Sequence, residues 1–283
     1  MRVTLLGTGT PWPSATRMST ANLVETGGDL MLVDAGRAVS VQLARLGRHP
    51  RDIDVVLLTH HHFDHISGLD DLLLAAWNDG RQRPVRIFGP PGTQALLRTL
   101  LAVVYARDIT FRLREAAVLG HDMPDPLALF QVNDLVAGQS ASGEGWSATP
   151  FAVEHGHALG LDPADWPCFG YRIEGGSKVL AFSGDTVDCA GVRALAQGAD
   201  LLVQCCYLPE AAVDNAERRL IVDQVLASAT QAGAIAAAAG VRRMVLTHIA
   251  PRADTMHDAM LTEARTGHGA EVLLGADLMA IEV

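Results

Sequence analysis

Four imidazoles and a carboxylate crowd into seven consecutive residues, Thr59–His65, and this cluster constrains the chain more than any other feature of the sequence. It follows the apolar run VVLL, which predicts a short buried strand. Side chains at alternate positions leaving a strand project to one side, so His60 and His62 can meet one metal ion. A turn into a helix at Asp64 would direct that carboxylate and His65 toward a second ion. A solvent-exposed histidine-rich loop is the alternative, but a metal explains why groups that repel one another when protonated are kept together.

Three more ligand-type residues follow apolar strands later in the chain. His155 comes after a strand ending at Val153, Asp185 follows KVLAF, and His248 follows MVL. Sites in α/β proteins usually lie at strand ends, so their order after the histidine cluster predicts one shared metal centre. Taken alone, Asp185 is equally well a turn residue and His248 a surface histidine. His157 is an alternative to His155 as the ligand, or a residue that contacts substrate.

Composition and patterning predict one α/β domain over residues 1–283. Hydrophobic residues make up 49% of the 283 residues and charged residues 19%, so a large core can be buried and wholesale disorder is disfavoured. Apolar runs alternate with amphipathic stretches, and no linker divides them. Helices are expected over Thr93–Val104 and Arg218–Ala239, whereas 116–145 has no clear period.

Charge, cysteines and the N-terminus set expectations for partners and compartment. The net charge of -10 disfavours binding to polyanions, so no nucleic-acid partner is expected. The four cysteines form no CxxC pair and predict free thiols in the cytoplasm. The N-terminus lacks a secretory pattern, and no apolar run approaches about 18 residues, so no membrane partner is expected. A homo-oligomer is left open.

Short motifs along nearly the whole chain resemble one known family. They are LLGTGTP at the start, VDAG at 33–36, the HxHxDH pattern at 60–65, FGPPGT at 88–93, VEHG at 153–156, FGYRIE at 169–174, FSGDT at 182–186 and LTHIAPR at 246–252. Together they are similar to the ribonuclease Z and arylsulfatase-type branch of the metallo-β-lactamase superfamily. The resemblance implies an α/β fold, a four-layer αββα sandwich with the metals at one edge.

The resemblance also implies a ligand set for two divalent ions, most simply Zn²⁺, with manganese or iron as alternatives. His60, His62 and His155 would hold one ion; Asp64, His65 and His248 the other; and Asp185 would bridge both. The family pattern places the ligand before a glycine, which favours His155 over His157. Asp34 is expected to orient a metal ligand, although a strand-end turn would also place an aspartate there.

Two departures from the family pattern shape the expected function. A His-Glu pair of the processing ribonucleases is matched here by Gln204-Cys205, and a later histidine by Leu226, so tRNA 3′ processing is disfavoured. The expected activity is hydrolysis of a small-molecule ester, a phosphodiester first, by attack of a metal-bridging hydroxide with Asp64 relaying the proton. Alternatives are a lactone or amide hydrolase, for which Tyr207 would polarise the carbonyl, an arylsulfatase-like esterase, or a non-catalytic metal-binding module.

Overall fold

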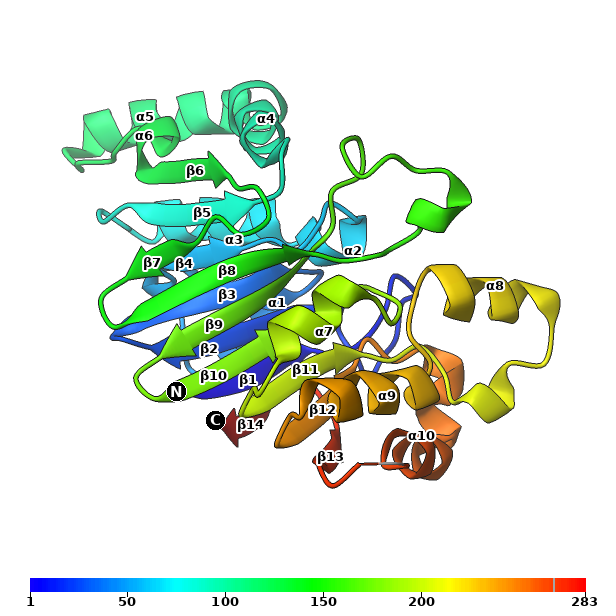
Figure 1. Cartoon of the computed structure of the whole chain (residues 1–283). Helices are drawn as coiled ribbons and strands as arrows, with labels where there is room; N and C mark the ends of the chain where they lie inside the picture. The colour runs from blue at the N-terminus through cyan, green and yellow to red at the C-terminus, as the bar shows by residue number, and fades with distance from the viewer. Residues whose placement is uncertain (267) are drawn as a thin grey trace.

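Two seven-stranded sheets form the centre of the computed structural model, which describes residues 1–266 and 268–283 (Figure 1). The first sheet has the order β14-β1-β2-β3-β4-β5-β6. Its strands are β1 (Arg2–Gly7), β2 (Ala21–Thr26), β3 (Asp29–Ala35), β4 (Val55–Leu57), β5 (Val85–Gly89), β6 (Phe130–Asp134) and β14 (Met279–Glu282).

The second sheet has the order β13-β12-β11-β10-β9-β8-β7. Its strands are β7 (Ala141–Gly143), β8 (Trp146–Ala152), β9 (Phe169–Gly175), β10 (Lys178–Phe182), β11 (Leu201–Cys205), β12 (Arg243–Thr247) and β13 (Glu271–Leu274). In both sheets the chain begins antiparallel and then continues through parallel strands joined by helices.

Helices cover the outer face of each sheet (Figure 1). Those on the first sheet's side are α1 (Val39–Arg45), η1 (Pro50–Asp52), α2 (Phe63–Ile66), α3 (Leu69–Asn78), α4 (Thr93–Thr99), η2 (Leu100–Val104), α5 (Ala106–Leu119) and α6 (Pro126–Leu129). Those that follow the strands of the second sheet are η3 (His157–Leu159), α7 (Ala190–Ala196), η4 (Glu210–Ala212), α8 (Ala216–Gln224), α9 (Ala229–Ala239), η5 (Pro251–Thr255) and α10 (His257–Ala264).

Alternating side chains build three apolar layers. Along β3, Met31 and Val33 pack between the two sheets, while Leu32 packs under the helices of the first sheet. The period of two in a strand produces this division, because successive side chains point to opposite faces. The expected four-layer αββα sandwich is therefore confirmed. A core shared between the two sheets is consistent with one domain. The single-domain interpretation itself stays a prediction.

The helix expected over Arg218–Ala239 is two helices. Helix α8 ends at Gln224, and α9 starts after Ser228, whose hydroxyl accepts a hydrogen bond from the backbone N–H of Gln231 at 3.3 Å. A serine that caps a helix N-terminus competes with helix continuation, which explains the break. By length and composition the stretch Ala216–Ala239 could still cross a membrane, but half of its apolar window is buried, as in a core helix.

The stretch without clear period, 116–145, holds the end of α5, α6, β6 and β7. The helix expected over Thr93–Val104 is α4 followed by the π-helical turn η2. Cytoplasmic localisation and oligomeric state stay predictions.

Candidate metal centre

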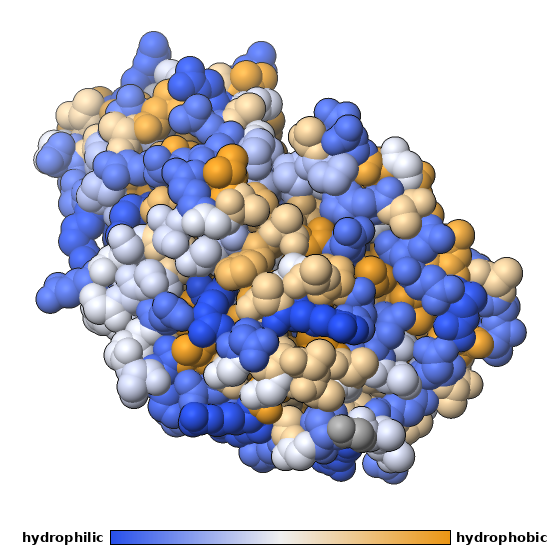
Figure 2. Space-filling view, in the orientation of Figure 1, coloured by the Kyte–Doolittle hydropathy of each residue, from blue (hydrophilic) through white to orange (hydrophobic). Residues whose placement is uncertain are grey.

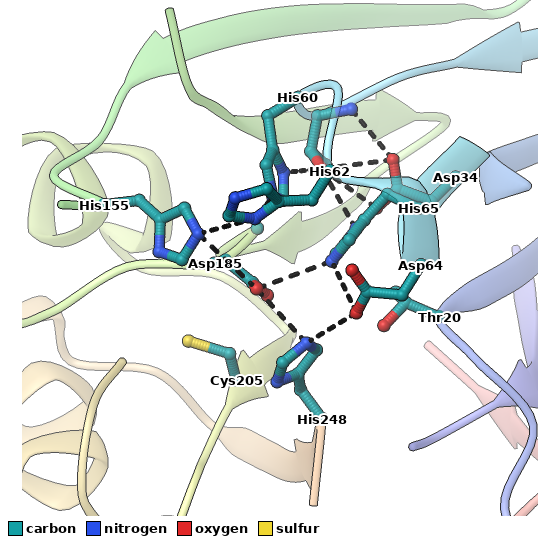
Figure 3. A network of polar contacts seen from close by, with 12 residues as sticks. Thr20, Asp34, His60, His62, Asp64, His65, His155, Asp185, Cys205 and His248 are labelled. Carbon is teal, nitrogen blue, oxygen red and sulfur yellow. Dashed lines mark hydrogen bonds and ion pairs between the residues drawn. The ribbon is translucent and has the colours of Figure 1, made fainter. Parts of the chain in front are cut away.

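The histidine cluster leaves β4 in an extended conformation and then turns into α2. His62 has φ -61° and ψ 143°, and α2 begins at the next residue, Phe63. This change of conformation separates the cluster into two pairs: His60 and His62 precede the helix, whereas Asp64 and His65 lie on its first turn. All four side chains point toward one centre (Figure 3).

The second sheet delivers the other three side chains from separate strand ends. His155 follows β8, Asp185 follows β10 and His248 follows β12. Strands β10, β11 and β12 are mutually parallel, so their carboxyl ends share one edge of the sheet. The centre lies at this edge, facing the cluster from the first sheet (Figure 3).

These seven residues fall into two groups whose ligand atoms lie within 4.8 Å of one another. The first metal-ligand group comprises His60, His62, His155 and Asp185. The second metal-ligand group comprises Asp64, His65 and His248. Every residue that the sequence predicted as a ligand belongs to one of these groups. His157 belongs to neither.

Nitrogen and oxygen atoms crowd closely in both groups. In the first, Nδ1 of His62 lies 3.0 Å from Nε2 of His60 and 3.0 Å from Nε2 of His155. In the second, Oδ2 of Asp64 lies 3.3 Å from Nε2 of His248.

Asp185 contacts both groups. Its Oδ2 lies 3.1 Å from Nε2 of His248, 3.4 Å from Nε2 of His65 and 3.9 Å from Nε2 of His155. This is the position that a carboxylate bridging two cations would need.

Burial and charge divide the imidazoles into neutral and protonated ones. Burial lowers the pKa of His60 well below its usual value, and it lowers the pKa of His62 to about 4. Both are neutral near pH 7, which is the form that binds a metal. Burial alone would also lower the pKa of His65, but the carboxylates of Asp185 and Asp34 raise it well above the usual value.

The carboxylates are held ionised. Burial alone would raise the pKa of Asp185, but the neighbouring His248 and His65 keep that pKa well below its usual range. Burial also opposes the ionisation of Asp64, and the hydrogen bond with His248 lowers its pKa. Anionic oxygens beside neutral imidazoles are a donor set suited to a divalent cation.

Asp34 fixes the orientation of His65. Its Oδ2 lies 2.7 Å from Nδ1 of His65, and its Oδ1 accepts a hydrogen bond of 2.8 Å from the backbone N–H of Thr59. With Nδ1 occupied, Nε2 of His65 faces the centre. Similarly, Nδ1 of His155 donates to the carbonyl of Val225 at 2.7 Å. The roles of Thr59 and Val225 in orienting the site were not expected from the sequence. Both contribute backbone groups, which a pattern of side chains cannot reveal.

Two site residues hold an unusual backbone. Asp34 has φ 63° and His248 has φ 58°, both in the left-handed region. Only a small fraction of residues other than glycine adopt it, although Asn, Asp and His are enriched there. Such strain clusters at functional sites, where the surrounding structure enforces it.

The residues fit a metal. Among the described residues, Oδ1 of Asp64 and Nε2 of His65 are buried without a hydrogen-bond partner. Unsatisfied buried polar atoms are rare in native proteins and call for a ligand or an ion. The set offers imidazole nitrogens and carboxylate oxygens, which are the usual ligands of zinc.

The structure gives His157 and Tyr207 other contacts. Nε2 of His157 donates to the carbonyl of Trp166 at 2.8 Å, and its Nδ1 accepts from the backbone N–H of His155 at 3.4 Å. Tyr207 is buried in the core under the helices of the second sheet, with the guanidinium of Arg252 over its ring. A role in substrate binding stays a prediction for both residues.

The site and fold together define a metal-dependent hydrolase of the metallo-β-lactamase fold, with five histidines and two aspartates at one sheet edge. Residues 30–249 match the Beta-lactamase superfamily domain, and the chain belongs to that superfamily.

Relatives extend over the full chain. A protein named Ribonuclease Z from Mycobacterium sp. (strain KMS) is 35% identical, with 100% of this chain and 96% of the relative covered. Among solved structures, the metallo-beta-lactamase fold protein YhfI from Bacillus subtilis aligns with a TM-score of 0.74 at 22% identity, covering 99% of this chain and 98% of its own. Human tRNase Z, short form, aligns with a TM-score of 0.68 at 24% identity, covering 100% and 99%.

These comparisons contradict two expectations. The sequence disfavoured tRNA 3′ processing and predicted a small-molecule substrate with no nucleic-acid partner; both are wrong, because the full-length relatives are named Ribonuclease Z. Net charge misled because it sums over the whole molecule, whereas cations at the site can reverse the sign locally. The missing His-Glu pair misled because, in this chain, the fold and both metal-ligand groups form without it. Here Cys205 is a buried packing residue whose Sγ lies 3.2 Å from the carbonyl oxygen of Thr186.

Proposed function

We propose that this protein is a ribonuclease that hydrolyses a phosphodiester bond in RNA, with precursor tRNA as the substrate. One observation carries the proposal: a chain 35% identical over its full length to a protein named Ribonuclease Z also brings seven ligand-type residues to one centre. An RNA phosphodiester presents an anionic, tetrahedral reacting group, which suits a site built for divalent cations.

We also propose two Zn²⁺ ions per chain, with manganese or iron as alternatives. The first metal-ligand group would hold one ion and the second the other, with Asp185 shared between them. The geometry supports His155 rather than His157 as the ligand, because both ring nitrogens of His157 already face backbone groups.

When bound by these residues, divalent cations would supply a nucleophile from water at neutral pH and would neutralise charge that develops on the phosphate. The chain's own residues orient and move protons around them. Asp64 is placed to accept a proton from the attacking water, since its Oδ1 is buried without a hydrogen-bond partner among the described residues. Asp34 and the carbonyl of Val225 hold His65 and His155 in the ring orientation that a metal needs.

The test uses metal-loaded protein and a precursor tRNA with a 3′ trailer, and it maps the cleavage position. Specific cutting near the end of the acceptor stem is expected, with loss of cutting in His248→Ala. The matched control is His121→Ala, an exposed histidine outside both metal-ligand groups, which should cut normally. A sample that hydrolyses bis-p-nitrophenyl phosphate but leaves precursor tRNA intact would overturn the ribonuclease proposal.

A further inference from the structure

An apolar pocket of about 300 Å³ opens beside the first metal-ligand group. Its walls come from the loop after β6, the end of β8, the loop that follows, and the start of β9 (Figure 1). The lining residues that matter below are Ala137, Ala152, Glu154, His157, Cys168 and Phe169. The face of the molecule drawn in Figure 2 carries apolar residues near its middle, among polar ones. A pocket of this volume is at the small end of those that take small ligands.

Residues that line the pocket are next to metal ligands in the sequence or are hydrogen-bonded to their neighbours. Glu154 directly precedes His155, and the backbone N–H of Phe169 donates to the carbonyl of Thr59, next to His60, at 2.9 Å. Trp166 lies in the same loop, directly before the lining residue Pro167: its ring centroid is 4.7 Å from that of His62, and its Nε1 donates to the carbonyl of His155 at 3.2 Å. A ligand in the pocket would therefore lie beside whatever reacts at the centre.

Among the described polar side chains that line the pocket, only one is free to accept a hydrogen bond from a ligand. Both ring nitrogens of His157 are bonded to backbone groups. Burial, with a smaller contribution from Asp185, raises the pKa of the Cys168 thiol to about 12, so it carries no charge. The carboxylate of Glu154 has no hydrogen bond or ion pair with any described residue. Ala152 and Glu154 both line the pocket and are both exposed to solvent, so the Glu154 carboxylate is accessible to a ligand there.

We infer that this pocket binds one nucleobase of the RNA, next to the bond that is cut, and that Glu154 selects guanine. The inference rests on the proposed ribonuclease function. Single-stranded bases are recognised by inserting the flat ring among apolar side chains and bonding its Watson–Crick edge. Guanine presents two adjacent donors, N1–H and N2–H, to the two oxygens of a carboxylate. Uracil presents one N–H between two carbonyl oxygens, which would face the Glu154 carboxylate and be repelled.

Binding of free nucleosides tests the pocket without any cleavage. Metal-loaded protein is titrated calorimetrically with guanosine and with uridine, neither of which contains a phosphodiester. Guanosine is expected to bind about tenfold or more tightly than uridine, which is the effect of a hydrogen bond to a charged group. Glu154→Gln should remove this preference, and Ala137→Trp should fill the pocket and abolish binding of both nucleosides.

Two control variants carry the same chemical changes elsewhere. Glu144→Gln alters an exposed carboxylate at the turn between β7 and β8, and Ala117→Trp adds an indole on α5; neither residue lines the pocket. Both should bind guanosine as the unmodified protein does. Equal binding of guanosine and uridine, undetectable guanosine binding, or full binding by the Ala137→Trp variant would each overturn the inference.

The two proposals fail separately. If guanosine binds as expected and precursor tRNA is not cut, the pocket stands and the ribonuclease function fails. If tRNA is cut but guanosine does not bind, the function stands and the pocket inference fails. If both hold, RNA with guanine at one flanking position should be cut about tenfold faster than RNA with uracil there, and Glu154→Gln should erase that ratio.

Discussion

The two sheets contribute to the metal centre in different ways. The first sheet delivers four side chains from one continuous segment, His60–His65, whereas the second delivers three from strand ends up to 93 residues apart in the chain, His155, Asp185 and His248. Yet neither metal-ligand group belongs to one sheet: each mixes residues from both. The centre therefore forms only when the two sheets pack face to face, and folding and metal binding are expected to be coupled.

Removing Asp185 should have the largest effect, because its carboxylate contacts both metal-ligand groups. We expect Asp185→Asn to lose at least one bound ion and to cut RNA more than about 1000-fold more slowly, beyond the loss typical of a single transition-state contact. Elemental analysis and single-turnover kinetics measure both. Asp122→Asn, at an exposed carboxylate, is the control; two ions retained in Asp185→Asn would contradict the shared position.

Variants of His155 and His157, which both follow β8, test which of the two histidines is the metal ligand. His155→Ala should lose metal and most activity, because its Nε2 lies in the first metal-ligand group. His157→Ala should keep the metal and alter KM or kcat, because its ring holds the backbone of Trp166. Metal content of the two purified variants decides the matter, and the reverse pattern would assign the ligand to His157.

The four ligands of the first sheet were predictable because they are local. A seven-residue pattern after an apolar strand determines both their spacing and their direction, and the turn at Phe63 was the one conformational assumption required. A lone aspartate or histidine after a strand is ambiguous, so the second sheet's ligands were predictable only from their order after the histidine cluster, and the choice of His155 over His157 needed the resemblance to a known family. Carbonyl contacts such as that of Val225 depend on a loop where the sequence predicted continuous helix, so periodicity could not reveal them.

The orienting residue Asp34 should have an intermediate effect. Asp34→Asn keeps the left-handed backbone, which asparagine tolerates, but weakens the contact to Nδ1 of His65. Metal affinity should fall by about 10–100-fold, as for other residues that orient a ligand. Competition with a chromogenic chelator measures this, and an unchanged affinity would show that His65 orients itself without Asp34.

The two metal-ligand groups should also differ in their response to pH. The low pKa of His60 and His62 leaves the first group ready for a metal, whereas nearby carboxylates raise the pKa of His65 and His248 in spite of burial. A metal entering the second group must displace those protons, so its affinity should fall as pH drops. The expected slope is roughly tenfold per pH unit for each proton displaced. Stepwise zinc titrations at several pH values should show one site whose affinity depends steeply on pH and one whose affinity depends on it weakly. Equal pH dependence at both sites would contradict the difference between the two groups.

The smallest expected effect is on stability alone. Ser228→Ala removes the side-chain cap of α9 and should lower the free energy of unfolding by about 1 kcal/mol without changing metal content. Denaturant titration of the metal-loaded protein checks this, with the exposed Ser142→Ala as control. A loss of metal in Ser228→Ala would show that the helix, and not only the strand ends, positions the ligands of the second sheet.

The left-handed backbone at His248 limits how the metal preference of this centre can be redesigned. At His60 and His62 the backbone is not in the left-handed region, so exchange for cysteine or aspartate meets no backbone constraint there. At His248 the replacement must also accept φ 58°, which a cysteine does poorly and an aspartate or asparagine tolerates. Directed evolution toward a thiolate-rich centre that prefers softer metals can therefore introduce cysteine at His60 or His62. At His248 the backbone disfavours cysteine even where a thiolate would suit the ion.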